Sequence, residues 1–235
     1  MTAYARSSSR LALAALLISN GVLIVMALTM KWSYYAPLLI FWCESVIIGA
    51  LNLVKMLITA IWGSPFGKWV AFENGAAAVL GTSVLALYFA VKFGGFVLGT
   101  GLFALILPAF FDPESGAIAA IDAFRDQGPS IAIGAGALAI SHAISLVLNF
   151  VGRREYERTN LFVLLFWPYA RVLWLHLMMI AGVIAVALMP FEERSLVFAI
   201  ALVLIKLAGD VASHLVERHR FGIRGRAAPP VADRT

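Results

Sequence analysis

The sequence predicts an all-α, polytopic transmembrane helix bundle of about six spans, and three observations lead to this fold class. Hydrophobic residues make up 62% of the 235 residues and charged residues only 13%, whereas ordinary soluble domains carry roughly one quarter charged residues. Several apolar stretches exceed the about 18 residues that mark a membrane-spanning helix. The basic residues gather in short loops and at the chain ends. This composition excludes a soluble domain, and arginines without interleaved aromatic residues argue against a nucleic-acid partner.

The apolar stretches define the predicted spans in order. They cover Leu11–Met30, Ala36–Ile61, Ala76–Phe110, Ile131–Val151, Leu161–Met189 and Ser195–Val216. The first stretch resembles a signal peptide because Arg6 and Arg10 precede it. No small-residue cleavage site follows it, however, and the next segment, 31–35, carries aromatic residues typical of a membrane interface. We therefore expect this helix to remain in the mature chain.

The third stretch is long enough for one tilted helix or two short ones, and loop charge favours one. With six spans, one side receives Arg6, Arg10, Lys68, Arg153, Arg154, Arg158, Arg218, Arg220, Arg224, Arg226 and Arg234. The other side receives only Lys31, Arg125 and Arg194. Because cytoplasmic loops carry the excess of Lys and Arg, six spans with both termini in the cytoplasm are predicted.

The remaining segments complete a single predicted bundle over residues 1–223. Segment 112–130 alternates charged and apolar residues at helical spacing, which predicts a short amphipathic helix on the outer surface. The tail 224–235 contains Pro229 and Pro230 and lacks apolar periodicity, so we expect it to be disordered. Cys43 is the only cysteine, which excludes an intrachain disulfide.

Polar residues inside the spans are the candidate functional residues, because an ionisable side chain at mid-membrane costs at least about 2.5 kcal/mol. In the second span Glu44, Asn52 and Lys55 stand at i, i+8 and i+11, which places them on one stripe. In the sixth span Lys206 and Asp210 stand one turn apart. A Lys206–Asp210 ion pair that serves only helix packing is an equally good interpretation of that spacing.

Three further spans contribute candidates to the same predicted site. His142 lies near the middle of the fourth span, His176 in the fifth and Lys92 in the third. Arg171 is interpreted as reaching the cytoplasmic interface with its long side chain. Counting the lysines and arginine against the two acids leaves an excess of two positive charges, which favours an anionic guest such as a lipid phosphate or a carboxylate.

A transition-metal site is an alternative interpretation of the same residues. Imidazole and carboxylate groups from several helices suit zinc, iron or copper. The candidate ligands are His142, His176, Asp210 and His214. No His-Glu-x-x-His pair occurs, and a lone histidine in a span is more often a packing residue.

Several sequence blocks resemble an uncharacterised family of bacterial multi-pass membrane proteins, a domain-of-unknown-function family. These blocks are Phe41-Trp42-Cys43-Glu44, Ser141-His142, Pro168-Tyr169-Ala170-Arg171 with His176, and Lys206 through Asp210 to His214. The resemblance runs from the second span to the sixth and implies membership without an activity. Members carry His-Tyr-Gly where this chain has Lys92-Phe93-Gly94, which weakens a metal site at that position here.

Three classes of function remain open from the sequence. The first is a binding or accessory membrane protein, such as a small subunit of a larger complex, in contact with membrane lipids and other membrane-protein subunits. The second is a proton-coupled transporter that uses the intramembrane acids and histidines as a relay. The third is a metal-dependent membrane enzyme, which requires the histidines to converge. The resemblance implies the bacterial cytoplasmic membrane for all three.

Overall fold

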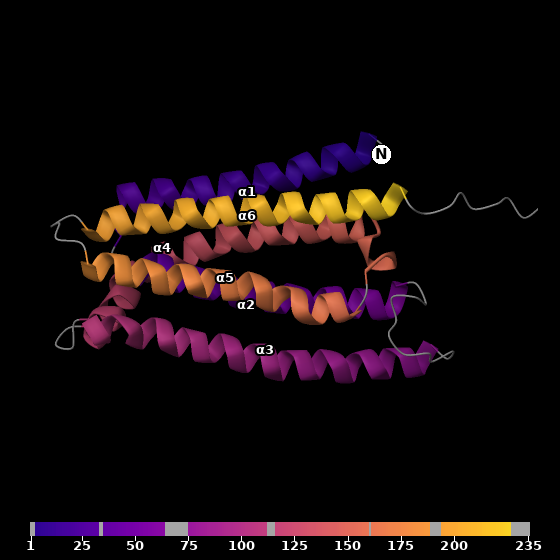
Figure 1. Cartoon of the computed structure of the whole chain (residues 1–235), viewed down its shortest axis with the longest axis horizontal. Helices are drawn as coiled ribbons and strands as arrows, with labels where there is room; N and C mark the ends of the chain where they lie inside the picture. Colours follow the sequence, from indigo (N-terminus) through magenta and orange to yellow (C-terminus); the bar gives the residue numbers. More distant parts are fainter. Residues whose placement is uncertain are drawn as a thin grey trace, which may run out of the picture.

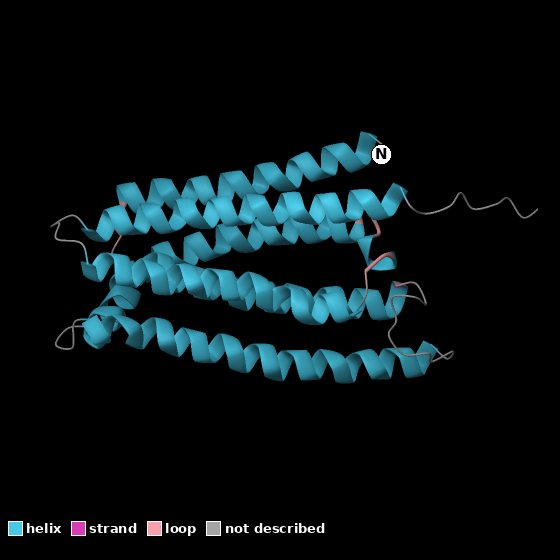
Figure 2. Ribbon diagram, viewed as in Figure 1, coloured by secondary structure: helices cyan, strands magenta, loops and turns pink. Residues whose placement is uncertain are grey.

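The structure is a computed structural model that describes residues 3–32, 35–63, 75–111, 116–159, 161–188 and 194–226. Over these residues the chain is helical apart from short turns, with no strand (Figure 2). The α-helices are α1 (Ala3–Thr29), α2 (Tyr35–Trp62), α3 (Gly75–Phe111), α4 (Gly116–Ser145), α5 (Leu161–Leu188) and α6 (Arg194–Arg226). A π-helical turn, η1 (Leu146–Val151), extends α4, and a short 3₁₀-helix, η2 (Glu155–Glu157), follows it. The predicted all-α bundle is confirmed.

Five of these helices are long and apolar enough to cross a membrane. The qualifying stretches are Leu11–Thr29, Tyr35–Trp62, Leu80–Phe103, Phe124–Val151 and Leu161–Ala181. The long third stretch forms one helix, α3. Helix α6, which carries Lys206 and Asp210, lies alongside α1 (Figure 1).

Two boundaries differ from the sequence predictions. Segment 112–130 was expected to form a separate surface helix, but from Gly116 onward it is the first part of α4, which continues through Pro129. A proline removes one helical hydrogen bond but does not have to end a helix inside a bundle, and here the Ser130 hydroxyl donates to the Gln127 carbonyl at 2.8 Å. The predicted tail begins later than residue 224, because α6 extends to Arg226; residues 227–235 lie outside the described part.

Helix α2 occupies the centre of the bundle. It packs against α3, α4, α5 and α6, whereas α1 packs against α4 and α6. Helices α1 and α3 therefore lie on opposite sides (Figure 1). Close approach depends on glycines at two places: a side chain at Gly49 would overlap the Phe93 ring, and one at Gly101 would overlap the Trp42 indole. The Trp42 Nε1 donates to the Val97 carbonyl of α3 at 2.9 Å, which fixes α2 against α3.

The apolar core divides into two clusters along the bundle. One joins the end of α1 and the start of α2 to α4, α5 and α6, around Trp32, Phe41 and Leu202. The other joins the later part of α2 to α3 and the start of α5, around Met56, Phe89 and Leu164. On α2, Glu44 lies between Phe41 of the first cluster and Met56 of the second. The polar residues around Glu44 therefore lie between two apolar layers.

Candidate functional site

Glu44 is the centre of the polar site. Its side chain is completely buried and accepts a hydrogen bond from the His142 Nε2 of α4 at 2.9 Å. The Lys206 Nζ of α6 lies 3.2 Å from the other carboxylate oxygen of Glu44. The Arg171 Nη2 of α5 lies 3.6 Å from Glu44. One carboxylate thus holds basic side chains from three other helices.

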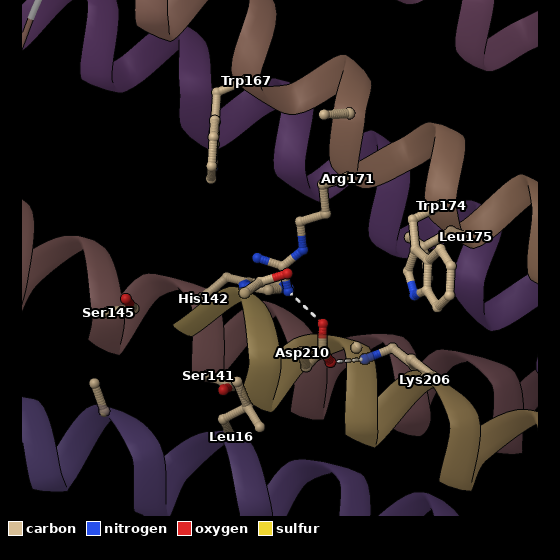
Figure 3. Close-up of a pocket in the computed structure, with 14 residues that line it drawn as sticks. Leu16, Ser141, His142, Ser145, Trp167, Arg171, Trp174, Leu175, Lys206 and Asp210 are labelled. Atoms are coloured by element: carbon tan, nitrogen blue, oxygen red, sulfur yellow. Dashed lines mark hydrogen bonds and ion pairs between the residues drawn. The ribbon is translucent and has the colours of Figure 1, made fainter. Parts of the chain in front are cut away.

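Asp210, one turn after Lys206 on α6, completes the network. It accepts a hydrogen bond from the Arg171 Nη2 at 2.8 Å and a second from Lys206, and both interactions are drawn in Figure 3. The Lys206 Nζ also donates to the Asn20 side-chain oxygen of α1 at 3.3 Å. Lys206 is thereby bound to α1, α2 and its own helix.

We call Glu44, His142, Arg171, Lys206 and Asp210 the charged cluster. Two carboxylates face two permanent cations, so the cluster has no net charge when His142 is neutral. A buried charge is tolerated only with such partners. The excess of two positive charges expected from the sequence is not found here, because Lys92 lies on the exterior and Lys55 lies over the Phe150 ring at 5.4 Å.

A cavity of about 170 Å³ lies directly against the charged cluster (Figure 3). Among the described residues α4 packs on neither α5 nor α6, and the cavity lies between them, with α1 as a further wall. Its lining residues are Ala12, Leu16, Ser141, His142, Ser145, Trp167, Ala170, Arg171, Trp174, Leu175, Lys206, Gly209, Asp210 and Ser213. The charged cluster therefore borders free space rather than a fully packed core.

Among the ionisable groups of the charged cluster, the two most accessible are hydrogen-bond donors. Arg171 has 24% of its side chain exposed and His142 15%, whereas Asp210 has 7% and Glu44 none. Trp167 and Trp174 lie four residues before and three residues after Arg171 on α5, so all three share one face. Serine hydroxyls from α4 and α6 complete the lining. The Arg171 and His142 side chains are therefore more accessible to a molecule in the pocket than the carboxylates are.

Gly209 shapes the pocket wall. A side-chain carbon at this position would come within 2.4 Å of the Trp174 Nε1. Glycine therefore lets the indole of α5 lie directly on the backbone of α6. The aromatic wall of the pocket depends on this close contact.

The structure brings together four of the residues proposed from the sequence and separates the others. Glu44, His142, Lys206 and Asp210 meet in the charged cluster. Asn52 instead donates to the Leu164 carbonyl at 2.8 Å, and its role is to join α2 to α5. His176 packs on Phe96 of α3 and donates from Nδ1 to the Val172 carbonyl at 2.7 Å. Lys92 is exposed on the outer side of α3.

Arg171 and Asn20 belong to the network but were not among the predicted site residues. Arg171 was assigned to the cytoplasmic interface, because its depth and long side chain allow it to reach water. In the structure, Arg171 points inward and pairs with Asp210. In the sequence, the available indication of this position is the pair of tryptophans four residues before and three residues after Arg171. Asn20 is a single amide in the first span, and its spacing identifies no partner.

The described residues do not support the metal interpretation. No group of three His, Cys, Asp or Glu side chains among them is placed to hold a metal ion. His142 and Asp210 are engaged by charged partners, and His176 bonds to a backbone carbonyl. The fourth candidate ligand, His214, lies in α6, but its side chain is outside the described part.

The fold and the site define an all-α bundle of membrane-spanning type with a charged pocket inside it. The chain belongs to DUF6498, a family of unknown function, whose model matches residues 2–226. The match covers every described helix. No curated protein and no solved structure matches the chain.

Proposed function

We propose that the protein is a binding protein of the bacterial cytoplasmic membrane whose pocket holds a small molecule with a carboxylate or phosphate group. The observation that carries this proposal is the position of the cavity. An ion-pair network that served only helix packing would be closed by side chains, whereas this one borders about 170 Å³ of free space.

The donors in the pocket support an oxygen-rich ligand. Arg171 presents a planar guanidinium that suits carboxylate and phosphate. It is held by Asp210 at 2.8 Å, so an entering anion would replace Asp210 as its partner. Lys206 would then keep Asp210 neutralised, because it contacts that carboxylate directly. Because the cluster has no net charge before binding, the anion would have to enter together with a proton or a cation to keep the site neutral.

The indole groups indicate where the rest of the ligand would lie. Trp167 and Trp174 border the cavity on both sides of Arg171, and indole rings combine an apolar face with one N–H donor. A ligand with an anionic end and an apolar body fits these walls. A lipid headgroup with the start of its chains and a free small anion share this chemistry.

The test is thermal unfolding of the detergent-purified protein with three separate probes: inorganic phosphate, acetate and phosphatidylglycerol. A ligand that binds only the folded state raises the midpoint as its concentration passes the dissociation constant. We expect one of the three probes to raise the midpoint. A shift with phosphatidylglycerol alone identifies a lipid, and a shift with phosphate or acetate identifies a free anion.

Two variants and a control decide whether the pocket is responsible. Ala170→Leu fills part of the cavity and leaves the charged cluster intact, and Arg171→Gln removes the exposed cation. Both should abolish the shift, whereas Arg153→Gln, in the turn after η1, should retain it. The proposal fails if no probe shifts the midpoint or if Ala170→Leu binds as well as the wild type.

A proton-coupled transporter is the second candidate, and the Glu44–His142 pair favours it. These two protonatable groups lie 2.9 Å apart beside the cavity, where α4 is separated from α5 and α6. Movement of α4 against that helix pair would open the cavity. The discriminating measurement is proton flux in proteoliposomes with a pH-sensitive dye. Flux that depends on an added oxyanion and is lost in Glu44→Gln supports transport, and its absence leaves binding alone.

A further inference from the structure

Lys92 is the only charged residue of α3. It lies near the middle of the apolar stretch Leu80–Phe103, at about 17 Å from either end at 1.5 Å per residue. Its side chain is exposed and makes no hydrogen bond or ion pair with another described residue. A lysine side chain spans about 6 Å, so Lys92 does not reach either surface of the membrane.

Lys92 also lies on the outer side of the bundle. Helix α3 forms one edge and packs inward on α2, α4 and α5 (Figure 1). The inward face carries the buried Phe89, Phe93 and Val97. A lysine facing lipid at this depth costs about 3 kcal/mol on insertion scales. A partner that carries the opposite charge would offset this cost.

The surface around Lys92 has the shape of a helix-docking site. Tyr88, Lys92, Gly95 and Gly99 stand at i, i+4, i+7 and i+11 and share one face of α3, and all four are exposed. Gly95 and Gly99 form the Gly-x-x-x-Gly spacing that lets membrane helices approach closely. We call these four residues the α3 outer stripe.

Among the described residues, neither of the two glycines makes a close helix contact. A side-chain carbon built at Gly95 or Gly99 meets nothing within 4 Å, unlike those at Gly49 and Gly101. Glycine inside a helix costs about 1 kcal/mol relative to alanine. Contact with another helix would offset this cost.

From these observations we propose that the α3 outer stripe binds a transmembrane helix of a different protein, one that carries an Asp or Glu near the membrane midplane. Its carboxylate pairs with Lys92, and its backbone lies against Gly95 and Gly99. A second copy of this chain does not fit, because a symmetric contact would place Lys92 against Lys92. Glu44 and Asp210 are already buried in the charged cluster, and Asp126 lies near the end of the stretch Phe124–Val151 rather than at its middle. The proposal does not depend on the pocket.

The experiment measures binding of defined peptides to the full-length protein in liposomes by energy transfer between fluorescent labels. The probe is a leucine-rich transmembrane peptide with one central Asp, and the comparison peptides carry Leu or Lys at that position. The Asp peptide should bind about tenfold more tightly than the Leu peptide. Lys92→Leu should abolish this difference, and Lys92→Glu should reverse the preference in favour of the Lys peptide.

A relocated lysine provides the matched control. The double variant Lys92→Leu/Leu98→Lys keeps the charge on the exposed side of α3 but moves it about 120° away from Lys92, at 100° per residue. Gly99→Leu keeps Lys92 and fills the stripe. Both should bind the Asp peptide as weakly as the Leu peptide. Equal binding by the relocated lysine, no preference for the Asp peptide, or wild-type self-association that Lys92→Leu removes would overturn the proposal.

Discussion

Glu44 has three basic neighbours and no exposed surface, so its charge is essential to the other four members of the charged cluster. Removing one partner of a buried ion network leaves the others uncompensated, which costs more than the network itself contributes. Loss of the Glu44 charge would leave His142 without its carboxylate acceptor, and Asp210 would be the one anionic partner left to Lys206 and Arg171 in the cluster. Within the charged cluster, we therefore expect the loss of stability to be largest for a substitution of Glu44.

We therefore expect Glu44→Gln to lower the free energy of unfolding by about 3 kcal/mol. The matched control is Glu157→Gln, whose partner Arg154 is 72% exposed and lies 3.5 Å away; an exposed pair contributes at most about 1 kcal/mol. Unfolding in mixed detergent micelles measures both. Equal effects of the two substitutions would show that the buried cluster is not a stabilising network.

The sequence identifies how deep a residue lies in the membrane and which face of its helix it occupies, but not which residue it pairs with. The stripe on α2 and the one-turn spacing on α6 identify Glu44, Lys206 and Asp210 as inward-facing, because insertion cost applies to each helix separately. The partner of Arg171 depends on how α5 is rotated against α6. The depth of Lys92 can likewise be predicted from the sequence, whereas its outward direction depends on how α3 packs against the other helices.

Helix contacts in this bundle depend on a few glycines, and the glycines differ in how close the neighbouring side chains lie. Gly209 has the Trp174 indole of α5 directly above it, whereas a side-chain carbon at Gly21 of α1 meets nothing within 4 Å. Alanine is favoured over glycine inside a helix by about 1 kcal/mol. The same substitution should therefore have opposite effects at the two positions.

We expect Gly21→Ala to raise the free energy of unfolding by about 1 kcal/mol. Gly209→Ala should lower it by about 1 kcal/mol, because overpacking outweighs the gain in helix propensity. Only Gly209→Ala should shift the tryptophan emission, since Trp174 has to move. Unchanged emission in Gly209→Ala, or stabilisation by both substitutions, would contradict the close contact between α5 and α6.

Element boundaries were predictable where apolar runs end at charged residues, but not where charged residues lie inside a helix. The six helices correspond to the six apolar runs. The charged residues of segment 112–130 predicted a separate surface helix, but from Gly116 onward this segment is the first part of α4, and Pro129 does not break it. The penalty of a proline is local, whereas the rest of α4 keeps its own hydrogen bonds and its contacts with α1 and α2.

One end of the described molecule carries the basic turn that contains Arg153, Arg154 and Arg158. The amino terminus and the turn containing Glu157 lie at this end, and the turn after α1 lies at the other (Figure 1). From the positive-inside rule we predict that the first end faces the cytoplasm. The pocket lies toward the same end, because it is lined by Ala12 and Leu16 of α1 and by the first half of α5.

This orientation is tested with an impermeant thiol reagent in a Cys43→Ala background, in which no other cysteine remains. Lys31→Cys, in the exposed turn after α1, should be labelled in intact spheroplasts. Glu157→Cys should be labelled only after permeabilisation. The reverse pattern would invert the orientation, and labelling of both positions in intact cells would contradict their location at opposite ends.

The π-helical turn η1 gives the end of α4 one residue more than an ordinary helix would use over the same length. The Gly152 N–H bonds to the Val147 carbonyl, five residues back, at 2.9 Å. Within this wide turn Asn149 and Phe150 are buried, while Val147 and Val151 are exposed. Because the wide turn takes up the extra residue, deletion of a single residue here would be absorbed as regular α-helix. The loop that leads into α5 would then keep its place, so the chain can lose a residue at this point without losing its topology.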